Sequence, residues 1–161
     1  MRDNRIFCLL LFIALSVMNL PSSACAEEAI ILSKGQALYV PAYSHIYAGS
    51  REKQLLLTVT LSIRNTDLKY PVTITSADYY GTKGELIKKY INRPVVLGPF
   101  ESIRYIVPQR DKSGGSGANF LVGWKSDKPV NQPLIESVMI GAQGQQGISF
   151  TSRGQAITNS N

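Results

Sequence analysis

The sequence contains few of the residues from which metal centres and covalent cross-links are built. Among 161 residues there is one histidine, His45, and there are two cysteines, Cys8 and Cys25, both near the N-terminus. The rest of the chain therefore has no basis for a disulfide framework or a cysteine-based zinc site. A single histidine also excludes a metal site built from several histidines of one chain.

Concentrated positive charge is missing as well. The formal net charge is +6, yet the basic side chains are scattered, and Lys88 and Lys89 form their only adjacent pair. This distribution lacks the basic footprint of a nucleic-acid-binding protein, so we expect no nucleic-acid partner. After residue 20, no run of the sequence is long and apolar enough to suggest a spanning helix.

The first 26 residues have the pattern of an export signal. Two arginines precede an apolar run over residues 6–20, and the small residues Ala24-Cys25-Ala26 then suit cleavage before Glu27. The run is shorter than the roughly 20 residues of a spanning helix, which disfavours a retained anchor. In an alternative, cleavage precedes Cys25, and a lipid on this cysteine associates the protein with a membrane. We therefore expect an exported protein, periplasmic or extracellular, with the lipid anchor as an open alternative.

Alternation of apolar and polar residues dominates the sequence that follows. In QLLLTVTLSIRN, residues 54–65, five apolar side chains at alternate positions share one face, which is typical of a half-buried strand. Similar short runs are separated by turn signals, such as GTKG at residues 81–84. We predict an all-β fold, a single immunoglobulin-like antiparallel β-sandwich of about seven to eight strands over residues 27–154. A polar tail would follow over residues 155–161.

Four strings of the sequence stand out by their order along the chain. They are YVPAYSHIY (39–47), LSIRNTD (61–67), DKSGGSGANF (111–120) and VMIGAQGQQGISFTSRG (138–154). Together they resemble a family of small exported bacterial proteins known only as a domain of unknown function. The resemblance implies export and a single domain, and it transfers no catalytic residue. LSIRNTD and the strands after it are also similar to immunoglobulin-like accessory domains of bacterial envelopes, which is an analogy of fold alone.

The stretch ALYVPAYSHIY, residues 37–47, is the first candidate for a contact surface. If one strand runs through it, Tyr39, Tyr43, His45 and Tyr47 lie on the same face, opposite smaller aliphatic side chains. Exposed rings offer rigid contact area with a polar tip, so Tyr43, His45 and Tyr47 are our candidate partner-binding residues. In the alternative, the rings cover one end of the sandwich and their hydroxyls are satisfied locally.

The glycine-rich loop RDKSGGSGANF, residues 110–120, is the second candidate. Its glycines permit positive φ, and its backbone amides could form a nest for an anion next to Arg110 and Lys112. Asp111 and Asn119 would then lie at the rim of the contact surface. In the alternative, the loop is a flexible connection whose Asp111 and Asn119 cap the adjoining strands.

The sequence contains no recognisable catalytic constellation. Ser116 in GGSGA departs from the G-x-S-x-G elbow of serine hydrolases, because Ala118 replaces the last glycine. We therefore expect a non-enzymatic binding module without metal or cofactor, whose partner is an envelope protein or a surface polymer. Two alternatives stay open. One is a structural lipoprotein anchored through Cys25, and the other is a metal-dependent protein or enzyme that joins His45 to a carboxylate. The candidate carboxylates are Asp78, Asp111 and Glu136.

Overall fold

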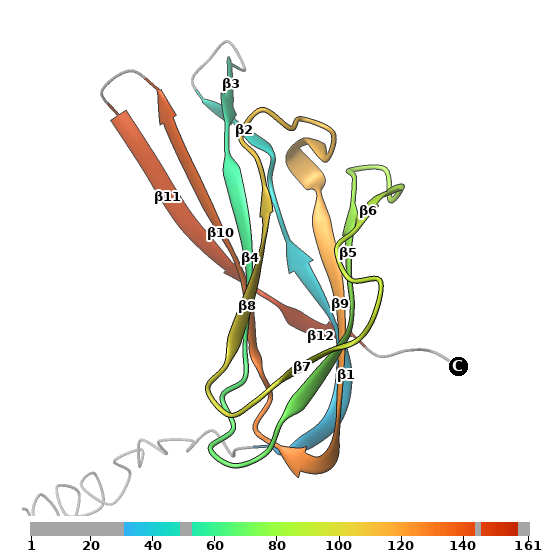
Figure 1. Ribbon diagram of the computed structural model, residues 1–161. Coiled ribbons are helices and arrows are strands. Elements are labelled where there is room, and N and C mark those ends of the chain that lie inside the picture. The colour runs from blue at the N-terminus through green and yellow to red at the C-terminus, as the bar shows by residue number, and fades with distance from the viewer. Residues whose placement is uncertain (1–30, 49–52, 144–145, 158–161) are drawn as a thin grey trace, which may run out of the picture.

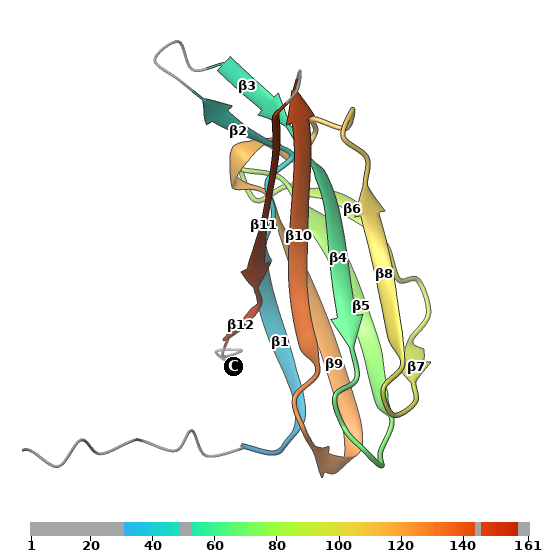
Figure 2. The ribbon, with the colours of Figure 1, turned by 90° about the vertical axis from the view of Figure 1, so that its left-hand side faces the viewer.

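The computed structural model describes residues 31–48, 53–143 and 146–157, so the predicted leader and Cys25 lie outside the described residues. The described chain is all-β, and its strands form two packed layers (Figure 1; Figure 2). Every pair of neighbouring strands is antiparallel within these ranges. The prediction of an antiparallel β-sandwich is therefore confirmed. None of the described residues belongs to a helix that is long and apolar enough to cross a membrane.

The larger layer is a six-stranded sheet. Its strands lie in the order β12 (Gln155–Ile157), β1 (Ser33–Pro41), β9 (Asn119–Val130), β5 (Val72–Tyr80) and β6 (Leu86–Lys89), and β7 (Val95–Leu97) also pairs with β5. The second layer has the order β11 (Gln146–Arg153), β10 (Leu134–Gln143), β4 (Thr58–Arg64) and β8 (Ser102–Val107). Two further strands, β2 (His45–Ala48) and β3 (Lys53–Leu56), form a separate hairpin.

The described residues form twelve strands, more than the seven to eight predicted, because several runs are interrupted. The run over residues 54–65 divides at Leu57, whose amide donates to the carbonyl of Ser44 (2.9 Å) instead of continuing one ladder. At Gly154 the chain passes from β11 in one layer to β12, which pairs with β1 in the other. The sheet thus includes residues 155–157, which we had assigned to the polar tail, because edge pairing requires backbone groups and no apolar side chain.

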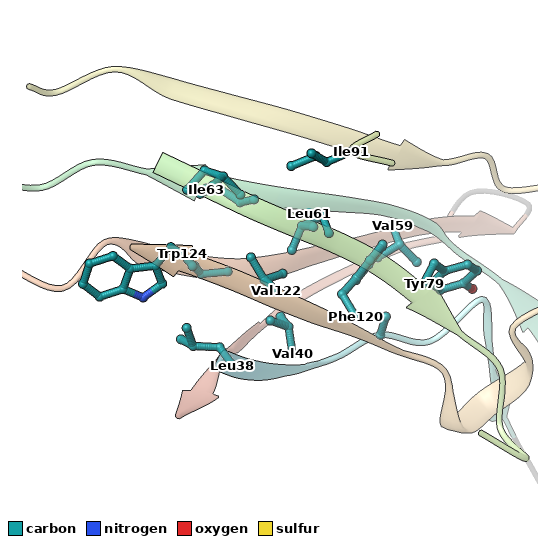
Figure 3. Close-up of a cluster of buried hydrophobic side chains, with 14 of the residues drawn as sticks. Leu38, Val40, Val59, Leu61, Ile63, Tyr79, Ile91, Phe120, Val122 and Trp124 are labelled. Carbon is teal, nitrogen blue, oxygen red and sulfur yellow. The ribbon is translucent and has the colours of Figure 1, made fainter. Parts of the chain in front are cut away.

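The core lies between the two layers and follows the predicted alternation. The apolar side chains that β4 and β9 bury include Val59, Leu61, Ile63, Phe120, Val122 and Trp124. Figure 3 shows them interleaved with Leu38 and Val40 of β1. Since burying one large apolar side chain contributes about 1.5–3 kcal/mol, this two-sided cluster accounts for a sandwich that stands without disulfides in its described part.

The hairpin between β5 and β6 turns at GTKG, as predicted. Gly84 has φ of +81°, a left-handed conformation that glycine adopts without a steric penalty. Just before the turn, Tyr79 is 1% exposed and its neighbour Tyr80 is only half-buried. One ring of the pair therefore enters the core and the other does not, and the pairing register shifts between the two residues.

A buried side-chain amide joins the turns at the lower end of the sandwich in Figure 1. Asn65 is 2% exposed, and its Nδ2 donates to the carbonyls of Tyr70 (2.9 Å), Leu97 (3.2 Å) and Gly98 (3.0 Å). Two N–H groups serve three acceptors, so one N–H is shared. The end of β4 is thereby held to the segment before β5 and to the end of β7.

The carboxylate of Asp67 extends this network to the turn after β9. Its Oδ1 accepts from the amides of Lys69 (2.9 Å) and Tyr70 (2.8 Å), and its Oδ2 accepts from the amide of Asn131 (2.9 Å). These three bonds hold the pKa of Asp67 below its usual value, and the bond from Asn131 has the largest effect. The ionised form is therefore favoured by folding. The ionised carboxylate of Asp67 contributes fully to stability above the usual aspartate pKa of about 4. This contribution is lost as the pH falls through the lowered pKa of the folded state.

We predict that Asn65→Ala lowers the free energy of unfolding by about 2–4 kcal/mol, because it leaves three carbonyls without their donor at a buried site. Urea-induced unfolding checks this. Asn92→Ala, at an exposed asparagine, is the matched control and should stay within about 0.5 kcal/mol of the wild type. An Asn65→Ala variant as stable as this control would contradict the role we assign to Asn65.

Candidate functional site

At the end of the sandwich opposite Asn65, the hairpin of β2 and β3 projects from the two layers (Figure 1; Figure 2). In this hairpin His45 lies opposite Leu56, and Tyr47 lies opposite Gln54. The hairpin thus carries two of the three residues that the sequence singled out for partner binding.

The chain turns between β1 and β2, and hydrogen bonds to the glycine-rich loop hold the turn. The amide of Ala42 donates to the carbonyl of Ala118 (2.8 Å). The amide and the hydroxyl of Ser44, which is fully buried, both donate to the carbonyl of Gly115 (3.0 Å each). The alternation of β1 therefore does not continue into β2. Our expectation that the rings from Tyr39 to Tyr47 share one strand face is wrong for this reason.

The two rings before the turn point to different surroundings. Tyr39 is 40% exposed on the outer face of the six-stranded sheet, since Leu38 and Val40 on either side of it are buried in the core. Tyr43 is half-buried against the core, and its ring centroid lies 5.9 Å from that of Phe150 in β11. The structure thus gives Tyr43 a packing role between the layers.

The two rings after the turn do lie together. His45 is 7% exposed, whereas Tyr47 is 54% exposed. The Nε2 atom of His45 lies 3.3 Å from the hydroxyl of Tyr47, and the two rings meet edge to face with centroids 5.3 Å apart. The buried imidazole therefore supports an exposed phenol. Its other nitrogen, Nδ1, is buried and makes no hydrogen bond to a described residue.

The glycine-rich loop is anchored on both sides. Its carbonyl at Gly114 accepts from the amide (3.0 Å) and the hydroxyl (2.9 Å) of Thr82, and the amide of Gly117 donates back to that hydroxyl (3.0 Å). A short 3-10 turn, η1 (Gly115–Gly117), lies between these contacts, with Gly115 at φ of +75°. The loop therefore links the β5–β6 turn to the base of the β2–β3 hairpin. Nothing in the sequence GTKG had pointed to Thr82 for this role.

Three of the amides that the proposed anion nest would use already donate to other groups. The amide of Ser113 donates to the carboxylate of Asp111, that of Gly115 to the carbonyl of Lys112, and that of Gly117 to Thr82. Asp111 also accepts from the hydroxyl of Ser113, so its carboxylate closes a local turn. Asn119 begins β9, where it lies opposite Pro41 of β1 and Tyr80 of β5. The loop is thus a segment beside the hairpin that is held by hydrogen bonds.

The buried phenol of Tyr79 lies against the glycine-rich loop, at Gly114. Burial, and next the negative charge of Asp111, raise the pKa of Tyr79 to about 12. The same two causes raise the pKa of Tyr90. Both phenols are therefore neutral near pH 7, and neither can serve as a base there. Gly114 covers the Tyr79 hydroxyl so closely that a Cβ atom at this position would overlap it and would lie 2.7 Å from the Cβ of Ala118.

The carboxylates that could have joined His45 are distributed over the molecule. Asp78 is in β5, opposite Lys89, and Glu136 is in β10 of the other layer, opposite Arg153. Asp111 bonds Ser113 in the loop. Within residues 31–48, 53–143 and 146–157, no three histidine, cysteine, aspartate or glutamate side chains gather where they could hold a metal ion.

The chain belongs to the family described as "Protein of unknown function (DUF3124)", whose model matches residues 35–157. This confirms the resemblance to a domain of unknown function that the four motifs indicated. No curated protein matches the chain. The chain is similar to a solved structure titled "Crystal Structure of Thermotoga maritima 1070", with a TM-score of 0.46 and 11% identity over 77% of this chain and 96% of that chain. A likeness this distant carries no functional argument.

We predict that Gly114→Ala lowers the free energy of unfolding by about 1–3 kcal/mol, because the added methyl group overlaps the Tyr79 hydroxyl. Adding Tyr79→Phe, which removes that hydroxyl, should recover part of the loss. Gly98→Ala is the control, since its Cβ would approach nothing closer than 3.5 Å. Urea unfolding of the variants measures the effect, and a Gly114→Ala protein with wild-type stability would show that the loop is not seated on Tyr79.

Proposed function

We propose that this member of the DUF3124 family is a non-enzymatic binding module of the cell envelope. It recognises a protein or a surface polymer with the end of the sandwich that carries the β2–β3 hairpin. The observation that supports this most is the pairing of an exposed aromatic side chain, Tyr47, with a buried side chain that orients it, His45.

Tyr47 has the features of an anchor for a partner. Its ring is more than half exposed, yet the contact of its hydroxyl with His45 and the edge-to-face arrangement of the two rings restrict its rotation. A restricted tyrosine loses little conformational entropy when a partner covers it. It also combines apolar contact area with a polar tip, and tyrosine is for this reason among the residues that most often dominate binding energy.

The bonded glycine loop supports the same function. The carbonyl of Gly115 holds the base of the hairpin through Ser44, so the position of Tyr47 relative to the sandwich is set before any partner arrives. Asp111 and Asn119 lie at the two ends of this loop, and they remain our candidates for the rim of the contact. Tyr43 contributes indirectly, by packing between the chain that enters the hairpin and Phe150.

The leader-like residues 1–26 support export, so the module would work in the periplasm or outside the cell. A lipid on Cys25 would hold it at a membrane surface. Either form leaves the β2–β3 hairpin far from the point where the first described residues enter the sandwich, because the two lie at opposite ends in Figure 1.

We predict that Tyr47→Ala lowers the yield of cross-linked partner by about tenfold or more, since it removes the exposed anchor. The tagged protein is cross-linked in intact cells that produce it, and its neighbours are quantified by mass spectrometry. The matched control is Tyr39→Ala, at a tyrosine that is exposed on the outer face of the six-stranded sheet.

Both variants should keep the melting temperature of the wild type, whereas Tyr43→Ala should lower it because that ring is packed. Equal yields from Tyr47→Ala and the wild type would contradict the proposal. So would an equal loss in Tyr39→Ala, which would mean that the hairpin has no special part in binding.

A further inference from the structure

The outer edge of β11 is an open sheet edge. β11 pairs with β10 from Gln146 to Arg153 without a shift in register, and no strand of the described residues pairs with its other side. In Figure 1 the β10–β11 hairpin leans away from the rest of the sandwich, and in Figure 2 β11 is the outermost strand of its layer. None of the described strands therefore covers this edge between Gln146 and Arg153.

The hydrogen bond that follows β11 identifies which of its backbone groups face outward. The amide of Gly154 donates to the carbonyl of Ile135 (2.8 Å), in register with the β10–β11 ladder. Backbone groups alternate in direction along an antiparallel strand. The amides and carbonyls of even-numbered residues therefore face β10, and those of odd-numbered residues face outward. The outward residues are Gly147, Ser149, Thr151 and Arg153.

The other edges of the two layers, as far as they are described, carry devices that oppose pairing. β12 and β7 have three residues each, and β6 ends in the two lysines Lys88 and Lys89. β8 carries Arg104 at its centre, and the carbonyl of Ile106 in β8 already accepts from the hydroxyl of Tyr90 (3.1 Å). Short length, charge and cover of this kind are how sheet proteins prevent edge-to-edge association.

β11 has none of these devices. It contains no proline and no lysine, its ladder has no bulge, and its one charged residue, Arg153, is at its end. We propose that β11 pairs, antiparallel, with β11 of a second copy of this chain, about a two-fold axis that passes beside Phe150. The paired strands join the four-stranded sheets of both copies into one continuous sheet.

The strand complements itself in this register. Ser149 of one copy lies opposite Thr151 of the other, and Gly147 lies opposite Arg153, so the outward backbone groups of both strands meet. The two arginines are at opposite ends of the pair and do not repel each other, as they would in a parallel arrangement. Phe150 lies opposite Phe150 of the second copy, and aromatic pairs across an antiparallel ladder are stabilising. These features favour a second copy over an unrelated strand as the occupant.

Sedimentation of the exported protein over a range of concentrations tests the proposal. The wild type should pass from monomer to dimer, and Ser149→Pro should stay monomeric, because proline removes an outward N–H and places its ring at the edge without breaking the ladder to β10. Ser149→Ala, the matched control, should dimerise like the wild type, since the pairing uses the backbone. Thr151→Lys, which places a charge at the same edge, is a second variant that should stay monomeric.

Amide hydrogen exchange provides a readout that only this edge can produce. With rising concentration of the wild type, the amides of Ser149 and Thr151 should become protected, whereas those of Ile148 and Phe150 should be protected at every concentration. A wild type that stays monomeric up to millimolar concentration would overturn the proposal. So would a dimer in which the amides of Ser149 and Thr151 still exchange rapidly. If these amides become protected only after an extended peptide is added, the edge pairs with another occupant. This result too would overturn the proposal.

Discussion

The fold depends most on one buried amide, because Asn65 satisfies backbone groups that no strand ladder reaches. Its Nδ2 serves three carbonyls, and its Oδ1 accepts from the amide of Asp67 (3.0 Å), whose carboxylate then bonds the turn after β9. Turns at the end of a sandwich otherwise leave such groups to water. Here the network joins turns from both layers, so their relative position at this end is set by hydrogen bonds as well as by the core between the sheets.

The opposite end is built differently, and the difference bears on function. The β2–β3 hairpin projects beyond the layers and is held at its base by the loop around Gly114 and Gly115. This leaves Tyr47 exposed but oriented. If two copies pair through β11 as we propose, the antiparallel arrangement points their two hairpins in opposite directions. With the proposed binding function, such a dimer would present two contact ends, and it would gain avidity wherever both partners belong to one surface or polymer.

The sequence predicted the parts of this structure that depend on local chemistry. Alternation over residues 54–65 identified the buried face of β4, and the glycines of GTKG identified the β5–β6 turn. It failed where distant residues decide the conformation. Ser44 turns the chain because the carbonyl of Gly115, 71 positions away, accepts its hydroxyl, and this contact ended the predicted strip of rings. The turn character of Asn65 was readable, but its bonds to Leu97 and Gly98 were not, since no local pattern encodes contacts 32 and 33 positions apart.

Native-state hydrogen exchange of the amides of Asp67, Tyr70 and Asn131 tests the central role of Asn65 and Asp67 most directly. All three amides lie in turns, and each donates to one of these two side chains. The account predicts that they exchange only when the whole domain unfolds, with free energies close to those of the amides in β9, while amides of the β2–β3 hairpin exchange through smaller openings. Rapid exchange of the three turn amides in the folded protein would contradict it.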